Sequence, residues 1–453
     1  MRKLILITSL FISAISFSQE HFTGLATSSR VGIMAADLNP AELRNMSHKF
    51  EINGFGTSIN VANNKISFKD LTSDSSLEKK LFEGNEPVNL RVNAVLLGPG
   101  FAIKAFNWAF AITSKANIKF DLIDVDTKLG DALSNGTLNS LVGASNLVST
   151  NNQRLNGVTY GEIGFSAAHT FFNTDTQRFN AGATVKLLFP GSYANIGLDK
   201  FTGTLTNAGG QVYLNNANAN LNIAYSGNLA NGFGNFSDYS KSVFGALNGF
   251  AVDFGVNYQF KGEDDAKNKY KLNVGMAVRN IGTMTFKGDN NVSTNYALKI
   301  QSTIPDPLGL NLNQFNNVDN LQEIETILKN KGYLAVQDSK SDIKVKLPAL
   351  FSAYADVKII PKLYISGYIQ QKLSNDSAND QLSNPNIFTI TPRCNLGFFE
   401  AFIPLTSSSV SGFNTGFGFR LGGFYLGSGS VITALANNSK QADAYIGFRT
   451  AFL

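Results

Sequence analysis

The chain has 453 residues, of which 43% are hydrophobic and only 16% charged, with 36 Phe and a formal net charge of +5. Soluble domains usually carry roughly 25% charged residues, so this composition argues against an ordinary soluble surface. This net positive charge is too small for a chain of this length to indicate a nucleic-acid-binding protein. After the extreme N-terminus there is no stretch of about 18 consecutive apolar residues, which excludes helical membrane spans.

The chain begins with the pattern of a secretory signal peptide. Arg2 and Lys3 form a positive region, residues 4–15 form a short apolar stretch, and small residues precede Gln19. This order of segments is what a signal peptidase recognises. The sequence therefore predicts an exported protein whose signal peptide spans residues 1–18.

The next segment, residues 19–47, differs from everything that follows it. Ala35-Ala36 and Asn39-Pro40-Ala41 interrupt any alternation of apolar and polar residues. Pro40 has no amide proton for a strand ladder. We expect this segment to form no part of a sheet.

From about residue 48 onward the dominant pattern has period two, which is typical of strands. In Phe250–Phe260, for example, large apolar residues occupy every even position and small or polar residues every odd one. A soluble sandwich also alternates but usually needs only about 100 residues. Export, length and strand length favour a transmembrane antiparallel β-barrel over residues 48–453, with apolar side chains facing lipid.

The alternating segments number about 14, an even count as bacterial single-chain barrels require. The predicted strands lie near 48–61, 88–105, 108–123, 156–171, 177–197, 249–261, 269–287, 342–358, 362–375, 386–394, 397–404, 409–420, 423–429 and 441–453. Short connections alternate with long links at 124–155, 198–248 and 288–341. Because short turns of such barrels lie in the periplasm, we expect both termini there and the protein in the outer membrane.

Two kinds of interruption are expected. Gly98-Pro99-Gly100 breaks the second strand and predicts a kink or bulge. Residues 317–331 carry apolar side chains at helical spacing, and Val125–Leu133 does the same over a shorter length. These two stretches predict short helices in the extracellular loops.

Residues for catalysis or metal binding are sparse. His21, His48 and His169 are scattered without paired spacing, and Cys394 is the only cysteine, so neither a metal site nor a disulfide is predicted. No Gly-x-Ser-x-Gly motif occurs. We therefore expect no enzymatic activity and no cofactor.

Charged and aromatic side chains gather on the face that points into the predicted lumen. The candidates are Arg91, Lys115, Lys119, Asp121, Glu162, Asp253, Arg279, Asp356, Tyr364, Tyr368, Arg420 and Arg449. Ionisable groups are costly against lipid, so an inward orientation is expected for all of them. Charges that pair across the lumen and hold a plug are one interpretation, and a subset that contacts a substrate is the other.

Several stretches resemble known barrels. Asn39-Pro40-Ala41 resembles a stretch near the mature N-terminus of FadL-like long-chain fatty-acid transporters. Leu97–Phe101, Gly161–Gly164, Tyr270–Gly282 and Ile390–Arg393 are similar to an uncharacterised family of Bacteroidota outer-membrane barrels, itself a remote relative of the FadL group. This resemblance covers most of the mature chain and implies a 14-stranded barrel with an N-terminal plug.

Two functions follow as expectations. One is passive uptake of a hydrophobic or amphipathic small molecule, with residues 19–47 as a hatch; Asn39, Pro40 and Ala41 would form its body, and Arg44 would pair with lumen acids. The other is an accessory barrel that docks protein partners in secretion, surface-lipoprotein display or barrel assembly. A tunnel past the hatch favours the first function, whereas a filled lumen with a flat loop surface favours the second.

Overall fold

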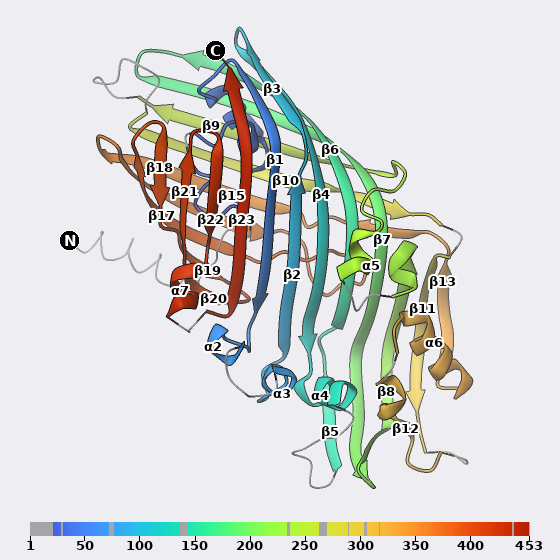
Figure 1. Cartoon of the computed structure of the whole chain (residues 1–453). Coiled ribbons are helices and arrows are strands. Elements are labelled where there is room, and N and C mark those ends of the chain that lie inside the picture. The colour runs from blue at the N-terminus through green and yellow to red at the C-terminus, as the bar shows by residue number, and fades with distance from the viewer. Residues whose placement is uncertain are drawn as a thin grey trace, which may run out of the picture.

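The structure is a computed structural model. It describes residues 21–28, 30–71, 77–135, 144–232, 236–261, 270–288, 290–302, 306–316, 318–436 and 439–452. The expected signal peptide at residues 1–18 lies outside the described residues. The strands form one antiparallel sheet that closes into a ring with 14 wall positions (Figure 1).

The wall is built almost entirely from consecutive neighbours. In order around the ring it consists of β1 (Phe50–Asn63), β2 (Val88–Leu97) with β3 (Gly100–Ala105), β4 (Trp108–Val125), β6 (Gln153–Asn173), β7 (Gln177–Ala208), β9 (Gly249–Phe260), β10 (Leu272–Phe286), β14 (Ile343–Lys346) with β15 (Leu350–Ile360), β16 (Leu363–Lys372), β17 (Ile387–Asn395), β18 (Phe399–Phe402) with β19 (Leu405–Ser408), β20 (Gly412–Thr415) with β21 (Phe417–Leu421), β22 (Phe424–Ser428) and β23 (Gln441–Phe452). Antiparallel pairing of β23 with β1, from Phe50↔Phe452 onward, closes the ring. The predicted barrel class is confirmed.

Period-two alternation separates an apolar outer face from a polar inner face. On β9, Phe254 is 54% exposed, whereas its neighbour Asp253 is completely buried. Ile59 and Asn60 on β1 divide in the same way. Buried polar residues inside and exposed large apolar residues outside invert the arrangement of a soluble protein.

The two ends of the barrel differ. Connections 106–107, 174–176, 361–362, 396–398 and 422–423 are brief and lie at the end where β1 starts and β23 finishes. We call this the short-turn end and the opposite one the long-loop end. The break predicted at Gly98-Pro99-Gly100 separates β2 from β3, while both pair with β1.

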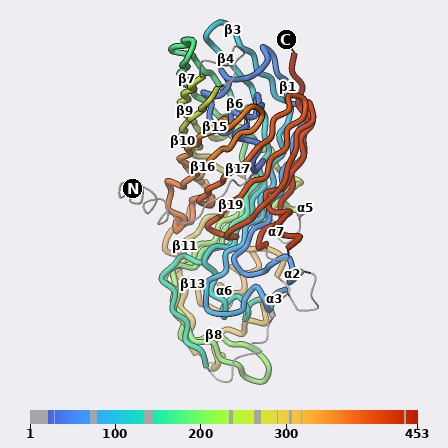
Figure 2. The backbone as a smooth tube through the Cα atoms, turned by 90° about the vertical axis from the view of Figure 1, so that its left-hand side faces the viewer, coloured from blue at the N-terminus to red at the C-terminus, as the bar shows by residue number. Residues whose placement is uncertain are grey.

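Beyond the long-loop end the sheet continues outside the ring. β7 is 32 residues long, and its second half pairs with β8 (Gln211–Ser226) and β5 (Ala144–Ser149) rather than β9. β11 (Val292–Ile300), β12 (Leu310–Asn311) and β13 (Leu334–Lys340) complete this extension, which Figure 2 shows reaching away from the C-terminus. Treating 124–155, 198–248 and 288–341 as links without strands was therefore wrong.

Short helices also gather at the long-loop end. They are α2 (Phe68–Leu71), α3 (Leu77–Leu81), α4 (Thr127–Asn135), η3 (Gly227–Ala230), α5 (Phe236–Ser240), η4 (Leu312–Phe315), α6 (Leu321–Asn330) and α7 (Val431–Leu435). Both α4 and α6 were predicted. The Asn320 side chain caps α6 by accepting the amide hydrogen of Glu323 at 2.9 Å. Among the described residues no helix is long and apolar enough to cross a membrane.

Candidate functional site: the barrel lumen

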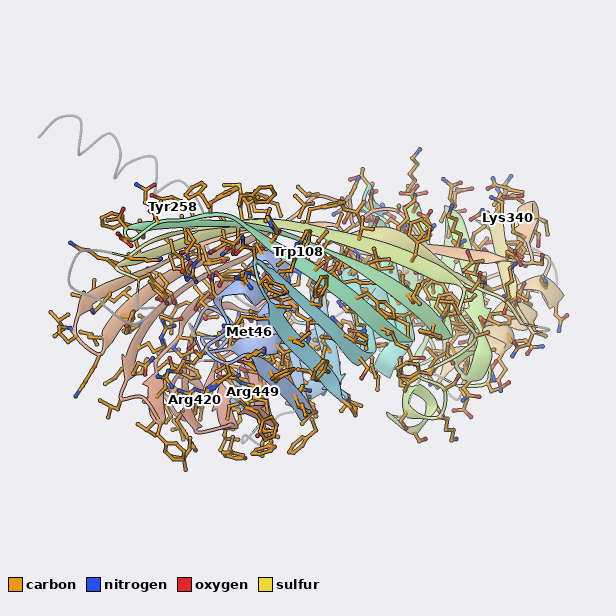
Figure 3. All side chains as sticks on the ribbon, turned by 90° about the horizontal axis from the view of Figure 1, so that it is seen from above. Met46, Trp108, Tyr258, Lys340, Arg420 and Arg449 are labelled. Atoms are coloured by element: carbon orange, nitrogen blue, oxygen red, sulfur yellow. The ribbon has the colours of Figure 1, made fainter. Side chains whose placement is uncertain are left out.

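An N-terminal segment, residues 21–28 and 30–46, lies against the inner face of the strands. It contains two 3-10 helices, η1 (Gly32–Asp37) and η2 (Pro40–Asn45). Their buried apolar side chains pack on inward-facing alanines of β3, β4 and β6, where small residues leave room for them. Figure 3 shows Met46, at the end of the segment, inside the ring of strands.

Asn39 fixes the start of η2 on the wall. Its side-chain oxygen accepts the amide hydrogen of Ala41 at 3.0 Å, which caps the helix. Its amide group donates to the backbone carbonyl of Val256 on β9 at 2.9 Å and to the Tyr354 hydroxyl at 3.2 Å. The side chain is fully buried, so these bonds satisfy a group that would be costly to leave unpaired.

Glu42 is held by neutral donors. Its Oε1 accepts hydrogen bonds from the side-chain amides of Asn257 at 2.8 Å and Asn273 at 2.9 Å, and from the Tyr354 hydroxyl. Asn45 donates to Oε2 at 2.7 Å. Burial raises the pKa of the Glu42 carboxyl above its usual value, since solvent no longer stabilises the charge.

A chain of ion pairs ties η1 to four strands. Lys115 Nζ of β4 lies 3.2 Å from Asp37 Oδ1 and 3.1 Å from Glu162 Oε1 of β6. Lys186 Nζ of β7 lies 3.7 Å from the same Glu162 oxygen and 2.7 Å from Asp253 Oδ2 of β9. The charges alternate in sign, so burial does not leave one of them without a counter-charge.

Arg44 was expected to pair with lumen acids, and that expectation is wrong. Its Nε donates to Thr170 Oγ1 at 2.8 Å and its Nη1 donates to the backbone carbonyl of Trp108 at 2.7 Å. η2 places Arg44 near the short-turn end, where neutral acceptors are its neighbours. Asp37 and Glu42 instead tie the segment to the wall, through Lys115 and through neutral donors respectively.

A second buried charge cluster lies on β15, β17, β18 and β21. Arg393 lies 2.6 Å from Asp356 and 2.9 Å from Glu400, and Arg420 lies 3.1 Å from Glu400. The Ser28 hydroxyl of the N-terminal segment donates to Glu400 Oε1 at 2.7 Å. This cluster therefore holds the segment from the opposite side of the lumen.

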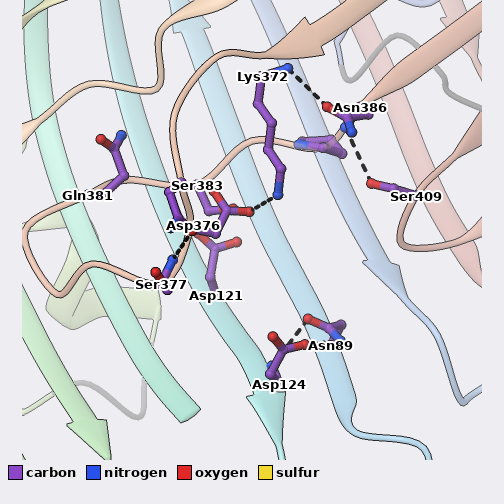
Figure 4. A network of polar contacts seen from close by, with 12 residues as sticks. Asn89, Asp121, Asp124, Lys372, Asp376, Ser377, Gln381, Ser383, Asn386 and Ser409 are labelled. Atoms are coloured by element: carbon purple, nitrogen blue, oxygen red, sulfur yellow. Dashed lines mark hydrogen bonds and ion pairs between the residues drawn. The ribbon is translucent and has the colours of Figure 1, made fainter. Parts of the chain in front are cut away.

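The connection between β16 and β17 folds back into the barrel. This inward loop, residues 373–386, crosses the lumen to β4, β6 and β7 (Figure 4). Tyr193 of β7 donates to the Asn379 carbonyl at 2.9 Å. Leu382, only 1% exposed, packs with apolar residues of the inner wall. The inward loop covers the lumen on its long-loop side.

A cavity of about 150 Å³ remains between the N-terminal segment and the inward loop. Its lining is mixed: apolar side chains include Phe22, Met34, Val95, Leu97, Leu350 and Tyr368, and charged ones include Asp37, Lys115, Lys119, Glu162, Lys186 and Arg279. Such a lining suits a small molecule with an apolar body and a polar group.

Comparison with known families decides the relationship of this chain. A family of unknown function, DUF5723, matches residues 40–429. The chain belongs to the DUF5723 family. No curated protein matches it significantly.

Solved structures similar to this DUF5723 barrel include three that cover nearly all of the chain. They are a deletion mutant of the monoaromatic hydrocarbon channel TodX (11% identity over 96% of this chain and 98% of that one, TM-score 0.49), the toluene transporter TbuX of Ralstonia pickettii (12%, 96% and 99%, 0.44) and a FadL homologue of Pseudomonas aeruginosa (8%, 96% and 98%, 0.42). At such scores the likeness carries no argument about function.

Within the DUF5723 barrel the predicted lumen residues are buried or half-buried side chains on the inner face of the wall. Arg279 donates to the Asp37 carbonyl at 2.8 Å and to Gln370 at 2.7 Å, Tyr364 stacks under Arg393, and Arg449 pairs with Glu51 at 3.0 Å. Sequence reasoning missed Asp37, Glu42 and the whole inward loop. The described residues contain no group of three or more His, Cys, Asp or Glu side chains that could hold a metal ion.

Proposed function

We propose that this chain lies in the outer membrane and passes hydrophobic or amphipathic small molecules through its lumen, with the N-terminal segment as a movable plug. The observation that carries the proposal is the mixed cavity between that segment and the inward loop. Exposed apolar side chains around the wall, such as Phe55, Phe110 and Phe254, support a lipid environment.

The plug role is supported by the kind of contact that the segment makes. The side chains of Asn39, Glu42 and Asp37 join it to the wall by hydrogen bonds and an ion pair, whereas the closed barrel needs no strand from it. Contacts of this kind can exchange for water, so the segment can shift without breaking the sheet. Passage would then require such a shift.

A tether across one contact tests the proposal. The hydroxyls of Thr27 and Ser366 lie 2.8 Å apart, so Thr27→Cys with Ser366→Cys can form a disulfide in a Cys394→Ser background. Vesicles that carry the barrel and enclose serum albumin would receive the amphipathic dye 8-anilinonaphthalene sulfonate. Oxidation should slow dye entry and reduction should restore it; equal entry in both states would contradict a moving plug.

The accessory role remains a second candidate because one surface favours it. β13 lies at the edge of the extension, pairs with β11, and nearly all its side chains are exposed, including Val336 at 63%. An exposed edge strand can accept a strand from another chain. A barrel that admits no dye in either redox state would favour this role.

A further inference from the structure

Three cations on the inner wall face the inward loop. They are Arg91 of β2, Lys119 of β4 and Arg154 of β6, and they are 7%, 6% and 1% exposed. We call them the cationic strip. Their strands are adjacent in the wall, so the three charges lie on one continuous surface.

The inward loop covers this strip with uncharged acceptors. Lys119 Nζ donates to the Asn384 side-chain oxygen at 2.5 Å, and Arg91 donates to the Ser383 hydroxyl. Arg154 Nη1 donates to the backbone carbonyls of Ala378 and Gln381 at 2.7 and 3.0 Å, and its Nη2 to that of Asp376. Charged donors thus meet neutral oxygens, although carboxylates form the stronger hydrogen bonds.

Carboxylates near the strip do not balance it. Asp121 Oδ1 lies 3.6 Å from Arg91 Nε, which offsets one of the three positive charges. The carboxylates of the loop add no net negative charge, since each pairs with a lysine, Asp376 with Lys372 and Asp380 with Lys346. A surplus of positive charge is therefore buried beneath the loop.

Hydrogen bonding of the strip is also incomplete. Arg91 Nη1 and Arg154 Nε are buried and make no hydrogen bond. A buried donor without a partner costs about 1–3 kcal/mol, and more when the group is charged. Both guanidinium groups could thus gain from an oxyanion that reached them.

We propose that the cationic strip is a binding site for an anionic group, and that the inward loop is a cover which this anion displaces. A carboxylate, sulfate or phosphate on an amphipathic molecule would replace the neutral oxygens of the loop. The site adjoins the lumen cavity, because Lys119 and Asn384 line both. The inference rests on the proposed conduit, in which the cationic strip selects anionic amphiphiles.

The test is the accessibility of the loop to a thiol reagent. Ser383 is 1% exposed, so Ser383→Cys in a Cys394→Ser background reports displacement through its reaction with a membrane-impermeant maleimide. Barrels in lipid nanodiscs would receive octyl sulfate below its micellar concentration, or octanol as a neutral probe of equal chain length. We expect octyl sulfate to raise the labelling rate several-fold and octanol to leave it unchanged. Equal rates with the two probes would overturn the proposal.

Charge variants identify the site that responds. Arg91→Gln, Lys119→Gln and Arg154→Gln together, or Lys119→Gln alone should the triple variant fail to assemble, should abolish the octyl sulfate response. The matched control removes three exposed charges, Lys287, Lys299 and Lys340, and should retain the octyl sulfate response. A response that survives loss of the strip would overturn the proposal. Because labelling reports binding rather than passage, a barrel that responds but transports nothing contradicts only the conduit.

Discussion

A Cβ atom on Gly255 would lie only 2.0 Å from Asn39 Oδ1, so β9 and the N-terminal segment meet where glycine alone leaves room. Gly182 of β7 has the same relationship with Pro40 and Ala41, whose backbone atoms would lie 2.7 Å from an added Cβ. The sequence Asn39-Pro40-Ala41 is therefore fitted to a floor of inward-facing glycines, and side chains there would displace it.

Replacement of one such glycine should expel the segment. In Gly255→Val the new side chain overlaps Asn39, and trypsin should then cleave faster after Arg44 while the barrel stays assembled. Gly367→Val on β16 is the control, since an added Cβ there meets nothing within 4 Å. Similar cleavage of both variants on a denaturing gel would show that the floor does not position the segment.

Loss of Lys115 should loosen the segment more than loss of Lys119. Both lysines lie on β4 and face inward, but Lys115 pairs with Asp37 and Lys119 contacts the inward loop. The Lys115–Asp37 pair is only partly buried, because the Asp37 side chain is 34% exposed, so its loss should cost less than the roughly 3–5 kcal/mol of a fully buried pair. Both variants would be compared by the open time of single barrels in planar bilayers and by the rate of trypsin cleavage of the segment. Lys115→Gln should raise both, whereas Lys119→Gln should leave the segment protected. The reverse order would contradict the assignment of Asp37.

The outer face should not tolerate charge. Phe254→Arg would place a cation against lipid at a cost of roughly 2–4 kcal/mol near the midplane, and Val274→Arg on β10 would do the same. We expect little heat-modifiable, assembled barrel from either variant. Phe254→Leu keeps the face apolar and should assemble like the parent. Normal assembly of the arginine variants would refute the inside-outside assignment.

Strands of the wall could be predicted because alternation reports directly which face is apolar. The same rule should have found β8, where Leu221 and Ile223 alternate with Asn220 and Asn222. Upstream of these residues, however, Ala replaces the bulky side chains, so the contrast between the faces weakens. Strands of the extension also pack against loops and helices rather than lipid, which relaxes the demand for a strict pattern.

Contacts across the lumen could not be predicted to the same extent. Alternation places Lys115 and Glu162 on the inner face, but the pairing of Lys115 with Asp37 depends on how η1 lies in three dimensions. The inward loop reads as an ordinary polar turn, Ser374–Asn379, and nothing local distinguishes a loop that enters the barrel from one that projects outward.

Deletion of residues 20–45, with the signal peptide kept, tests the plugged-conduit account most directly. The shortened chain keeps every wall strand, so it should assemble and migrate as a heat-modifiable barrel. In planar bilayers its conductance should exceed that of the parent, because the segment that Asn39, Glu42 and Asp37 hold in the lumen is gone. An assembled deletion variant as electrically silent as the parent would contradict the account.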